Sequence, residues 1–235
     1  NYVITPTSGA ACPGAPVSIA ITVNPQPVGV NDNIPIVCSG LATGYDLEAN
    51  IATLGNNLIA GNTYSWIATA NGSVSGESTL AQSGKIITDV LRNFTNGNQV
   101  VRYTIIPTSG AGCIGAPFTV DITVQPEPVG FNNASPVACS DVAFNYDLVA
   151  NIANTGAGGN NLTVGTTYSW LAAANPTVTG ESTVAQAGPT INDVINNITN
   201  SSQVVVYTVT PTSTNGCAGT PFTVSVTVRP EPKGF

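Results

Sequence analysis

Apolar and polar residues alternate with a period of two along most of the chain. In residues 118–124 every second position is apolar, and the positions between carry threonine or aspartate. Residues 17–23 and 222–228 show the same alternation of apolar positions. A period of two places one face of a β-strand in a core and the other in water. The pattern therefore predicts an all-β protein with half-buried strands.

The alternating runs are separated by turn-forming segments. A run at 101–105 and the strand at 118–124 are joined by 107–117, which is rich in Gly and Ser, so a hairpin is predicted. Further short strands are expected at 45–47, 63–68 and 74–78. About seven short strands in roughly a hundred residues is typical of an immunoglobulin-like β-sandwich.

One segment breaks the period of two. Apolar residues in 86–94, and again in 191–198, are spaced three or four positions apart, as in a helix. Their neighbours are Asn, Thr and Asp, which favour helices poorly. We expect a strand that runs into at most one helical turn.

The chain repeats itself with a period of slightly more than a hundred residues. The run that begins at Tyr2 recurs at Tyr103 and at Tyr207, at offsets of 101 and 104. The later copy carries three extra residues within 155–159, and an insertion there indicates a surface loop. Such self-similarity predicts tandem domains.

The repeat divides the chain into two full units, 28–129 and 130–235, preceded by residues 1–27, which match the C-terminal hairpin of a preceding unit. We expect the sequence to be a piece of a longer tandem array. Each boundary carries a Pro-x-Pro motif, which favours stiff polyproline II, so the array is expected to be an extended, jointed rod. The linker prolines are Pro25, Pro27, Pro126, Pro128, Pro230 and Pro232.

Aromatic residues mostly occupy apolar strand positions, which makes core packing their expected role. Trp66 and Trp170 stand where a buried tryptophan of the sandwich is expected. Tyr103 and Tyr207 lie on the alternating strands and are also predicted to be core residues.

Charge is scarce, with 12 acidic and 5 basic residues among 235 and a net charge of −7. This balance repels a polyanion, so no nucleic-acid partner is expected. Because the chain has no His, it cannot form a His-based triad or a His-ligated zinc site by itself. No apolar run approaches the ~20 residues of a membrane-spanning helix, so no membrane insertion is expected.

The carboxylates that recur in both units lie singly on different strands and loops, without the facing pair that a glycosidase needs. We expect them to serve capping, turn and surface roles, and we expect no enzymatic activity. They are Asp46 and Asp147, Glu77 and Glu181, Asp89 and Asp193, and Glu127 and Glu231.

Calcium at the linkers is the alternative considered for these acidic residues, because Asp32 and Glu127 lie near linkers. Asn133 takes the place of Asp32 in the second unit, so the charge is not repeated. No metal and no cofactor is therefore predicted.

Five cysteines fall at two kinds of position. Cys12, Cys113 and Cys217 are equivalent, and so are Cys38 and Cys139. Bonds within units, Cys38–Cys113 and Cys139–Cys217, would leave Cys12 for an absent upstream partner. Bonds across unit boundaries, Cys12–Cys38 and Cys113–Cys139, would leave Cys217 for a downstream unit.

Chain geometry favours the bonds within units. Cys113 lies at a hairpin tip, and the following strand carries the chain roughly 30 Å away. A bond across the boundary would then need the chain to reverse at a stiff Pro-x-Pro motif. Disulfides imply an oxidising compartment and hence export. Buried free thiols are the remaining interpretation.

Several motifs of the chain resemble the PKD-like repeats of very large Bacteroidota surface proteins, including gliding-motility adhesins exported by the type IX system. The motifs lie at 37–40, 63–66, 206–213, 216–224 and 228–232. The resemblance implies immunoglobulin-like PKD-like sandwiches in tandem, at the extracellular or outer-membrane surface. It implies a stalk or filament repeat of a secreted adhesin that supports gliding motility or surface attachment.

The implied partners are neighbouring repeats of the same chain, with surface polysaccharide or substratum bound through regions outside this sequence. The alternative is a module that binds carbohydrate or protein through its variable loops, such as 55–61 and 154–165. These loops differ between the copies, which favours tolerated variation over a shared site.

Overall fold

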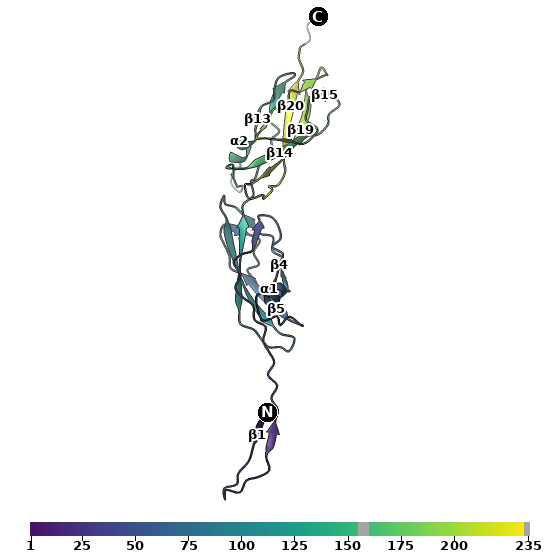
Figure 1. The fold of residues 1–235 in the computed structure, drawn as a ribbon. Coiled ribbons are helices and arrows are strands. Elements are labelled where there is room, and N and C mark those ends of the chain that lie inside the picture. The colour runs from purple at the N-terminus through teal and green to yellow at the C-terminus, as the bar shows by residue number, and fades with distance from the viewer. Residues whose placement is uncertain (155–159, 233–235) are drawn as a thin grey trace.

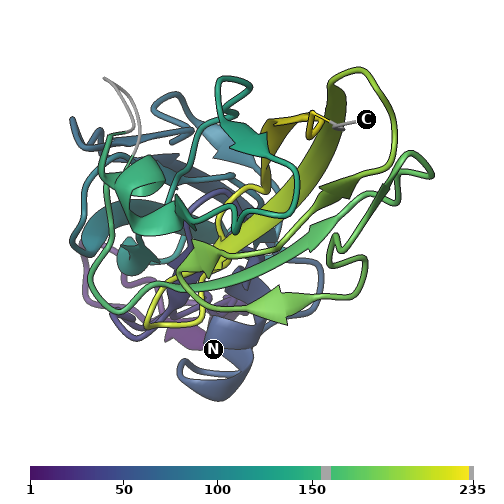
Figure 2. The ribbon, with the colours of Figure 1, turned by 90° about the horizontal axis from the view of Figure 1, so that it is seen from above.

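The structure, a computed structural model, describes residues 1–154 and 160–232. It is an elongated molecule in which an N-terminal hairpin and two β-sandwiches follow one another along one axis (Figure 1). Seen along that axis, the sandwiches lie one behind the other (Figure 2). The predicted all-β, tandem immunoglobulin-like fold is confirmed.

Each sandwich contains one five-stranded sheet, and the two sheets have the same strand order. In the first sheet the order is β3 (Ile36–Cys38), β11 (Phe118–Gln125), β10 (Gln99–Thr108), β5 (Thr63–Ala68) and β7 (Gln82–Ser83). In the second sheet the order is β12 (Val137–Cys139), β20 (Phe222–Arg229), β19 (Gln203–Thr212), β14 (Thr167–Ala172) and β16 (Gln186–Ala187).

Short two-stranded ladders complete the described structure. They pair β1 (Tyr2–Ile4) with β2 (Val17–Ile19), β4 (Tyr45–Asp46) with β8 (Ile86–Ile87), β6 (Val74–Ser75) with β9 (Arg92–Asn93), β13 (Tyr146–Asp147) with β17 (Thr190–Ile191), and β15 (Val178–Thr179) with β18 (Asn196–Asn197).

The predicted hairpin is formed by β10 and β11, which pair antiparallel with Tyr103 opposite Val120. The strand expected at 63–68 is β5. The strand expected at 45–47 covers only its first two residues, because Leu47 begins the helix α1 (Leu47–Thr53). The Asp46 carboxylate caps this helix by accepting from the backbone N–H of Glu48 and of Ala49, at 2.9 and 3.2 Å.

The same arrangement recurs in the second sandwich, where Asp147 caps α2 (Leu148–Ala153). The sequence analysis missed both helices because a helix of seven or six residues offers at most two turns of pattern. In 86–94 the structure has a strand at the start, β8, and no helical turn after it. Ile87 and Leu91 are both fully buried, but Ile87 ends β8 and Leu91 directly precedes β9, with an isolated bridge at Val90 between them.

Each sandwich has its own hydrophobic core, built from the inward positions of the alternating strands. Trp66 and Trp170 are buried, and their rings meet the rings of the fully buried Tyr103 and Tyr207 edge to face at 5.8 and 5.9 Å. Aromatic pairs favour this edge-to-face arrangement. All four residues lie in the cores for which the sequence predicted them.

A buried carboxylate anchors each core tyrosine. The hydroxyl of Tyr103 donates to Asp89 Oδ2 at 2.8 Å, and the backbone N–H and hydroxyl of Ser78 donate to the same carboxylate. Tyr207, Asp193 and Ser182 repeat the arrangement. Burial, and then the hydrogen bond to Asp89, raise the pKa of Tyr103 well above its ordinary value, so the phenol stays a donor. Asp89 therefore has a structural role.

We expect the substitution Asp89→Ala to destabilise the first sandwich by about 2–3 kcal/mol, because it leaves the buried Tyr103 hydroxyl without its charged acceptor. Urea unfolding followed by tryptophan fluorescence measures this change. The control is Glu48→Gln, which removes an exposed ion pair with Lys85 (3.1 Å) and should change the stability far less, because water screens this pair. Equal losses in the two variants would contradict the assignment.

Candidate functional site

The short strand β3 determines where Cys38 lies. It pairs in parallel with the end of β11, so that Cys38 stands opposite Gln125, the last residue of that strand. Cys38 is therefore at the end of the first sandwich that faces the second. Cys113 lies in the turn before β11 begins, at the opposite end of the same sandwich. Eight residues of strand separate these ends by roughly 27 Å.

Cys38 forms a disulfide with Cys217, which lies in the turn between β19 and β20 of the second sandwich. The Cα atoms are 5.5 Å apart, and Cys217 is fully buried. The expected pairs Cys38–Cys113 and Cys139–Cys217 are therefore wrong.

The boundary pairs Cys12–Cys38 and Cys113–Cys139 do not form either, and Cys12, Cys113 and Cys139 are free thiols in the described structure. Both predictions placed Cys38 at the wrong end of its sandwich. The linker does not reverse the chain. The segment after it continues along the molecule in parallel with the last strand of its own sandwich, and this carries Cys38 to the far end.

The disulfide lies where the two sandwiches and the linker between them meet, a region that we call the joint. Here an asparagine of the second sandwich forms hydrogen bonds with the linker. Asn160 is buried, and its Nδ2 donates to the carbonyl oxygens of Asn93 and Glu127 at 2.8 and 3.1 Å. The N–H of Val129 donates to the Asn160 carbonyl at 3.2 Å. The side chain of Asn96 donates to that of Asn161. One loop of the second sandwich thus bonds to both the linker and the first sandwich.

The linker itself is packed into this joint. Pro126 and Pro128 are buried, and Gly219 of the β19–β20 turn lies against Pro128. A Cβ atom at Gly219 would lie 1.9 Å from the carbonyl oxygen of Pro128, far inside van der Waals contact. Only glycine allows the turn that carries Cys217 to come this close to the backbone.

Glu127, between the two prolines, is 7% exposed and accepts a hydrogen bond from the Ser39 hydroxyl at 3.3 Å. Burial raises the pKa of this carboxyl, while the Ser39 bond and the charge of Arg92 act in the opposite direction. Its counterpart Glu231 is exposed. Of the recurring carboxylates, Glu127 is the one that lies in the joint.

The N-terminal hairpin meets the first sandwich through a similar, though not identical, set of hydrogen bonds. The Asn56 side chain donates to the carbonyl oxygen of Gln26 at 2.9 Å and accepts from the N–H of Val28 at 3.1 Å. A Cβ atom at Gly115 would lie 2.2 Å from the carbonyl oxygen of Pro27. The joint is therefore a repeated structure, present at both unit boundaries that the structure describes.

Sequence reasoning missed the joint asparagines and glycines. The sequence does carry a signal for the asparagines, because the tripeptide Asn-Asn-Leu is identical in the two units, at 56–58 and at 160–162. In the second unit it stands directly beside an insertion. The loops expected to bind a ligand in the alternative reading thus supply joint residues. The part of the second loop at 155–159 lies outside the described residues.

The acidic residues weighed for calcium do not come together. In residues 1–154 and 160–232, no group of three or more Cys, Asp or Glu side chains is close enough to hold a metal ion. Asp32 instead accepts a hydrogen bond from the Tyr45 hydroxyl at 2.8 Å. Within the same ranges, neither helix has the length and apolar character needed to cross a membrane.

A shallow polar recess of about 220 Å³ lies between Asp32 and the ion pair of Arg102 and Asp121. The second unit carries Asn133, Val206 and Ser225 at the equivalent positions. Neither the ion pair nor the charged side chains around the recess are therefore repeated.

These features define a tandem of immunoglobulin-like sandwiches joined end to end by a covalent cross-link. The PKD-like domain model matches residues 35–128 and 136–232, and the chain belongs to this family. No curated protein sequence matches the chain.

Solved structures resemble the chain only distantly. A SusE-like surface-located polysaccharide-binding protein of Bacteroides thetaiotaomicron is 12% identical with a TM-score of 0.30, and the match covers 72% of this chain and 29% of that one. A Bacteroides ovatus protein from a mixed-linkage glucan utilisation locus, in complex with a heptasaccharide, is 14% identical with a TM-score of 0.25, covering 86% and 43%. The titin I-band fragment I67–I69 is 14% identical with a TM-score of 0.29, covering 88% and 66%.

The chain thus spans less than half the length of the two Bacteroides proteins. At TM-scores of this size the likeness says nothing about function.

We expect Gly219→Ala to slow formation of the Cys38–Cys217 bond at least about tenfold. The added methyl group must displace the turn from the Pro128 carbonyl, and a displacement that costs ~1.4 kcal/mol lowers the population of the bonded geometry tenfold. The rate is measured by quenching reoxidation with a maleimide at set times.

The matched control is Gly115→Ala, which creates the equivalent clash with the Pro27 carbonyl at the other boundary. It should leave the rate of Cys38–Cys217 formation unchanged. If both variants slow the bond equally, the effect is not local to the joint.

The raised pKa of Glu127 gives the joint a specific pH dependence. The folded state holds this proton more tightly than the unfolded state, so the stabilising contribution is complete below the unfolded pKa and is lost as pH rises through the folded pKa. Glu127→Gln should therefore raise the melting temperature at pH 7 and flatten its fall between acidic and neutral pH.

The control Glu231→Gln changes the exposed counterpart and should leave the pH profile as in the wild type. Calorimetric melting curves from pH 4 to pH 7.5 measure both. A fall that persists unchanged in the Glu127→Gln variant would contradict the assignment.

Proposed function

We propose that the chain is a segment of the stalk of a large secreted surface adhesin or filament, and that its function is reach and mechanical continuity. The observation that carries the proposal is the Cys38–Cys217 disulfide, which joins two successive repeats across their joint. A cross-link at this place adds nothing to a ligand pocket or a catalytic centre. It does keep neighbouring repeats attached end to end.

The cross-link determines how a pulling force passes through the chain. A force applied at the two ends reaches Cys38, crosses the disulfide to Cys217, and leaves toward the C-terminal side. The segment between the two cysteines, which stand 179 positions apart in the sequence, is not loaded, although it makes up most of both sandwiches. The linked joint thus protects the repeats from forced unfolding.

The loops considered for ligand binding support the stalk proposal better than a binding module. Asn56 and Asn160 from these loops hold the linker on the N-terminal side of their own unit, and Asn161 contacts the first sandwich. Side chains used in the joint are not available to a sugar or a host protein.

The disulfide also supports an oxidising, extracellular location, because such bonds persist outside the reducing cytosol. We place the protein at the outer surface of a cell that exports it, with neighbouring repeats as its direct partners. On the resemblance of the repeats we also propose that the protein supports gliding motility or surface attachment and that the type IX system exports it. Any contact with polysaccharide or substratum belongs to other regions of the protein, and no enzymatic activity is proposed.

Single-molecule stretching tests the proposal directly. The chain is held at its two ends and pulled over the same range of force, first without and then with a reducing agent. Breaking the Cys38–Cys217 bond releases 179 residues, which adds about 60 nm of contour at roughly 3.5 Å per residue. We expect this gain only after reduction.

The double variant Cys113→Ser, Cys139→Ser is the matched control, because it removes two free thiols and keeps the bond. It should show the same gain of about 60 nm. A full-length extension in the absence of reductant would overturn the proposal, since the repeats would then bear the load themselves.

A further inference from the structure

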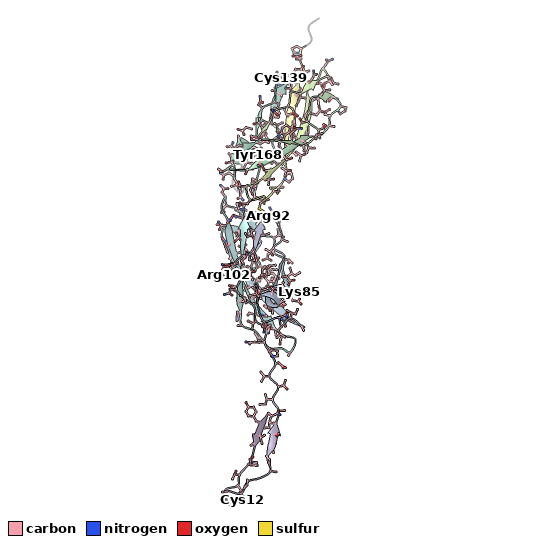
Figure 3. All side chains as sticks on the ribbon, viewed as in Figure 1. Cys12, Lys85, Arg92, Arg102, Cys139 and Tyr168 are labelled. Atoms are coloured by element: carbon pink, nitrogen blue, oxygen red, sulfur yellow. A yellow bond between two sulfur atoms is a disulfide. The ribbon has the colours of Figure 1, made fainter. Side chains whose placement is uncertain are left out.

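The described chain contains two segments that begin at a turn cysteine and end at a strand cysteine, Cys12 to Cys38 and Cys113 to Cys139. Each covers 26 positions. The second segment rises through β11, passes the linker, and then runs in parallel beside β20, first at Asn133 and then at β12. It ends with Cys139 opposite Arg229, at the far end of the second sandwich. In Figure 3, Cys12 and Cys139 are labelled near the two opposite ends of the molecule.

The first boundary is arranged for the same disulfide as the second. At the second boundary Cys217 Sγ lies 3.4 Å from the side chain of Gln125, the residue opposite Cys38. At the first boundary Cys113 Sγ lies 3.7 Å from the carbonyl oxygen of Asn24, the counterpart of Gln125. A strand equivalent to β3 that pairs there would bring its cysteine beside Cys113.

The far end of the second sandwich presents the complementary half of the joint. Cys139 is exposed and holds the same strand position as Cys38. Beside it is an open hollow of about 290 Å³, lined by residues 136–139 and 142–145. Cys139 is thus accessible at this end of the described chain.

We propose that Cys113 and Cys139 are covalent attachment sites for further PKD-like repeats of the same chain. Cys113 bonds the strand cysteine of the preceding repeat, and Cys139 bonds the turn cysteine of the following repeat. Cys12, which is equivalent to Cys113, takes part in the joint before that. The inference deepens the proposed stalk function and rests on it.

The consequence is that two separate covalent paths run along the array. We call each path, made of backbone segments and disulfides in turn, a line. One line passes from Cys12 to Cys38 and crosses to Cys217, while the other runs from Cys113 to Cys139. Each line spans two repeats with 26 residues and one disulfide, a contour of about 90 Å. Two repeats built on strands of ten residues measure roughly 70–80 Å. Such an array can lengthen only slightly, even when its sandwiches unfold.

Each bond forms by thiol–disulfide exchange with a small-molecule or protein disulfide. The Cys139 thiolate attacks the donor disulfide, forms a mixed disulfide and releases one donor thiolate. The turn cysteine of the next repeat then attacks the Cys139 sulfur and releases the second. Two cysteine thiols are oxidised, and the donor disulfide is reduced to two thiols.

The test is a chain lengthened by one repeat, made by adding a second copy of residues 132–235 after Phe235, and oxidised with glutathione disulfide. The Gly-Phe at 234–235 repeats that at 130–131, so the reading frame of the repeat continues. Cleavage after Glu77 and Glu181 places Cys139 in one peptide together with Cys113, and the variant Cys139→Ser distinguishes the two. Cleavage after the second copy of Glu181 gives the added turn cysteine its own peptide. Mass spectrometry without reduction then identifies the linked pair.

We expect Cys139 linked to the added copy of Cys217, with Cys38–Cys217 retained. In the matched variant Cys139→Ser the added turn cysteine should stay free. If Cys139 and the added cysteine both stay reduced while Cys38–Cys217 forms, the inference is overturned and the proposed function stands. If Cys38–Cys217 is missing as well, the proposed function falls too.

A second lengthened chain tests the same inference at the other end, in case the first added repeat does not fold. A copy of residues 28–101 placed before Asn1 completes a repeat with residues 1–27, because residue 1 is equivalent to residue 102. The expected link joins the added copy of Cys38 to Cys113. A free Cys113 in this chain, beside an intact Cys38–Cys217 bond, would also overturn the inference.

Discussion

The parallel pairing of β3 with the end of β11 is the constraint on which the rest of the structure depends. An antiparallel return would have brought Cys38 back toward the turn of its own sandwich. The parallel register instead places Cys38 opposite Gln125, at the end that faces the next sandwich. The buried linker, the glycine that allows the turn to approach it, and the disulfide all follow from that placement.

Hydrogen bonds from uncharged asparagine side chains to backbone carbonyl oxygens stabilise the sandwiches and the joint, where many other proteins use ion pairs. Asn93 is buried and donates to the carbonyl oxygens of Gly97 and Val124 at 2.8 and 2.9 Å, and Asn197 does the same in the second sandwich. Asn160 makes the equivalent type of contact in the joint. Interactions of this kind depend little on ionic strength. A net charge of only −7 is thus compatible with a stable rod in varied salt.

Much of the fold could be predicted because period-two alternation survives in each long strand. The strands β5, β10 and β11, and the core positions of Trp66 and Tyr103, follow from that pattern. The helices α1 and α2 could not be predicted in this way, since each begins directly after a two-residue strand and depends on one capping aspartate.

The joint escaped prediction for a different reason. Its disulfide connects cysteines of different repeats, and the choice of partner depends on which end of a sandwich each one occupies. That depends on the direction in which β3 pairs, and three residues of strand carry no pattern that gives a direction. The equal spacing of 26 positions from Cys12 to Cys38 and from Cys113 to Cys139 was visible, but it acquires meaning only with the parallel pairing.

The most direct test of the central claim is a disulfide map of the chain of 235 residues. Free thiols are alkylated, and the unreduced protein is cleaved after Glu48, Glu77 and Glu181, which separates the peptides that carry Cys38, Cys113 and Cys217. The account predicts one linked pair, residues 1–48 with the peptide that begins at residue 182, and alkylated Cys12, Cys113 and Cys139. A link between residues 1–48 and the peptide that begins at residue 78, with Cys12 and Cys139 alkylated, would place the bond within one repeat and contradict the account.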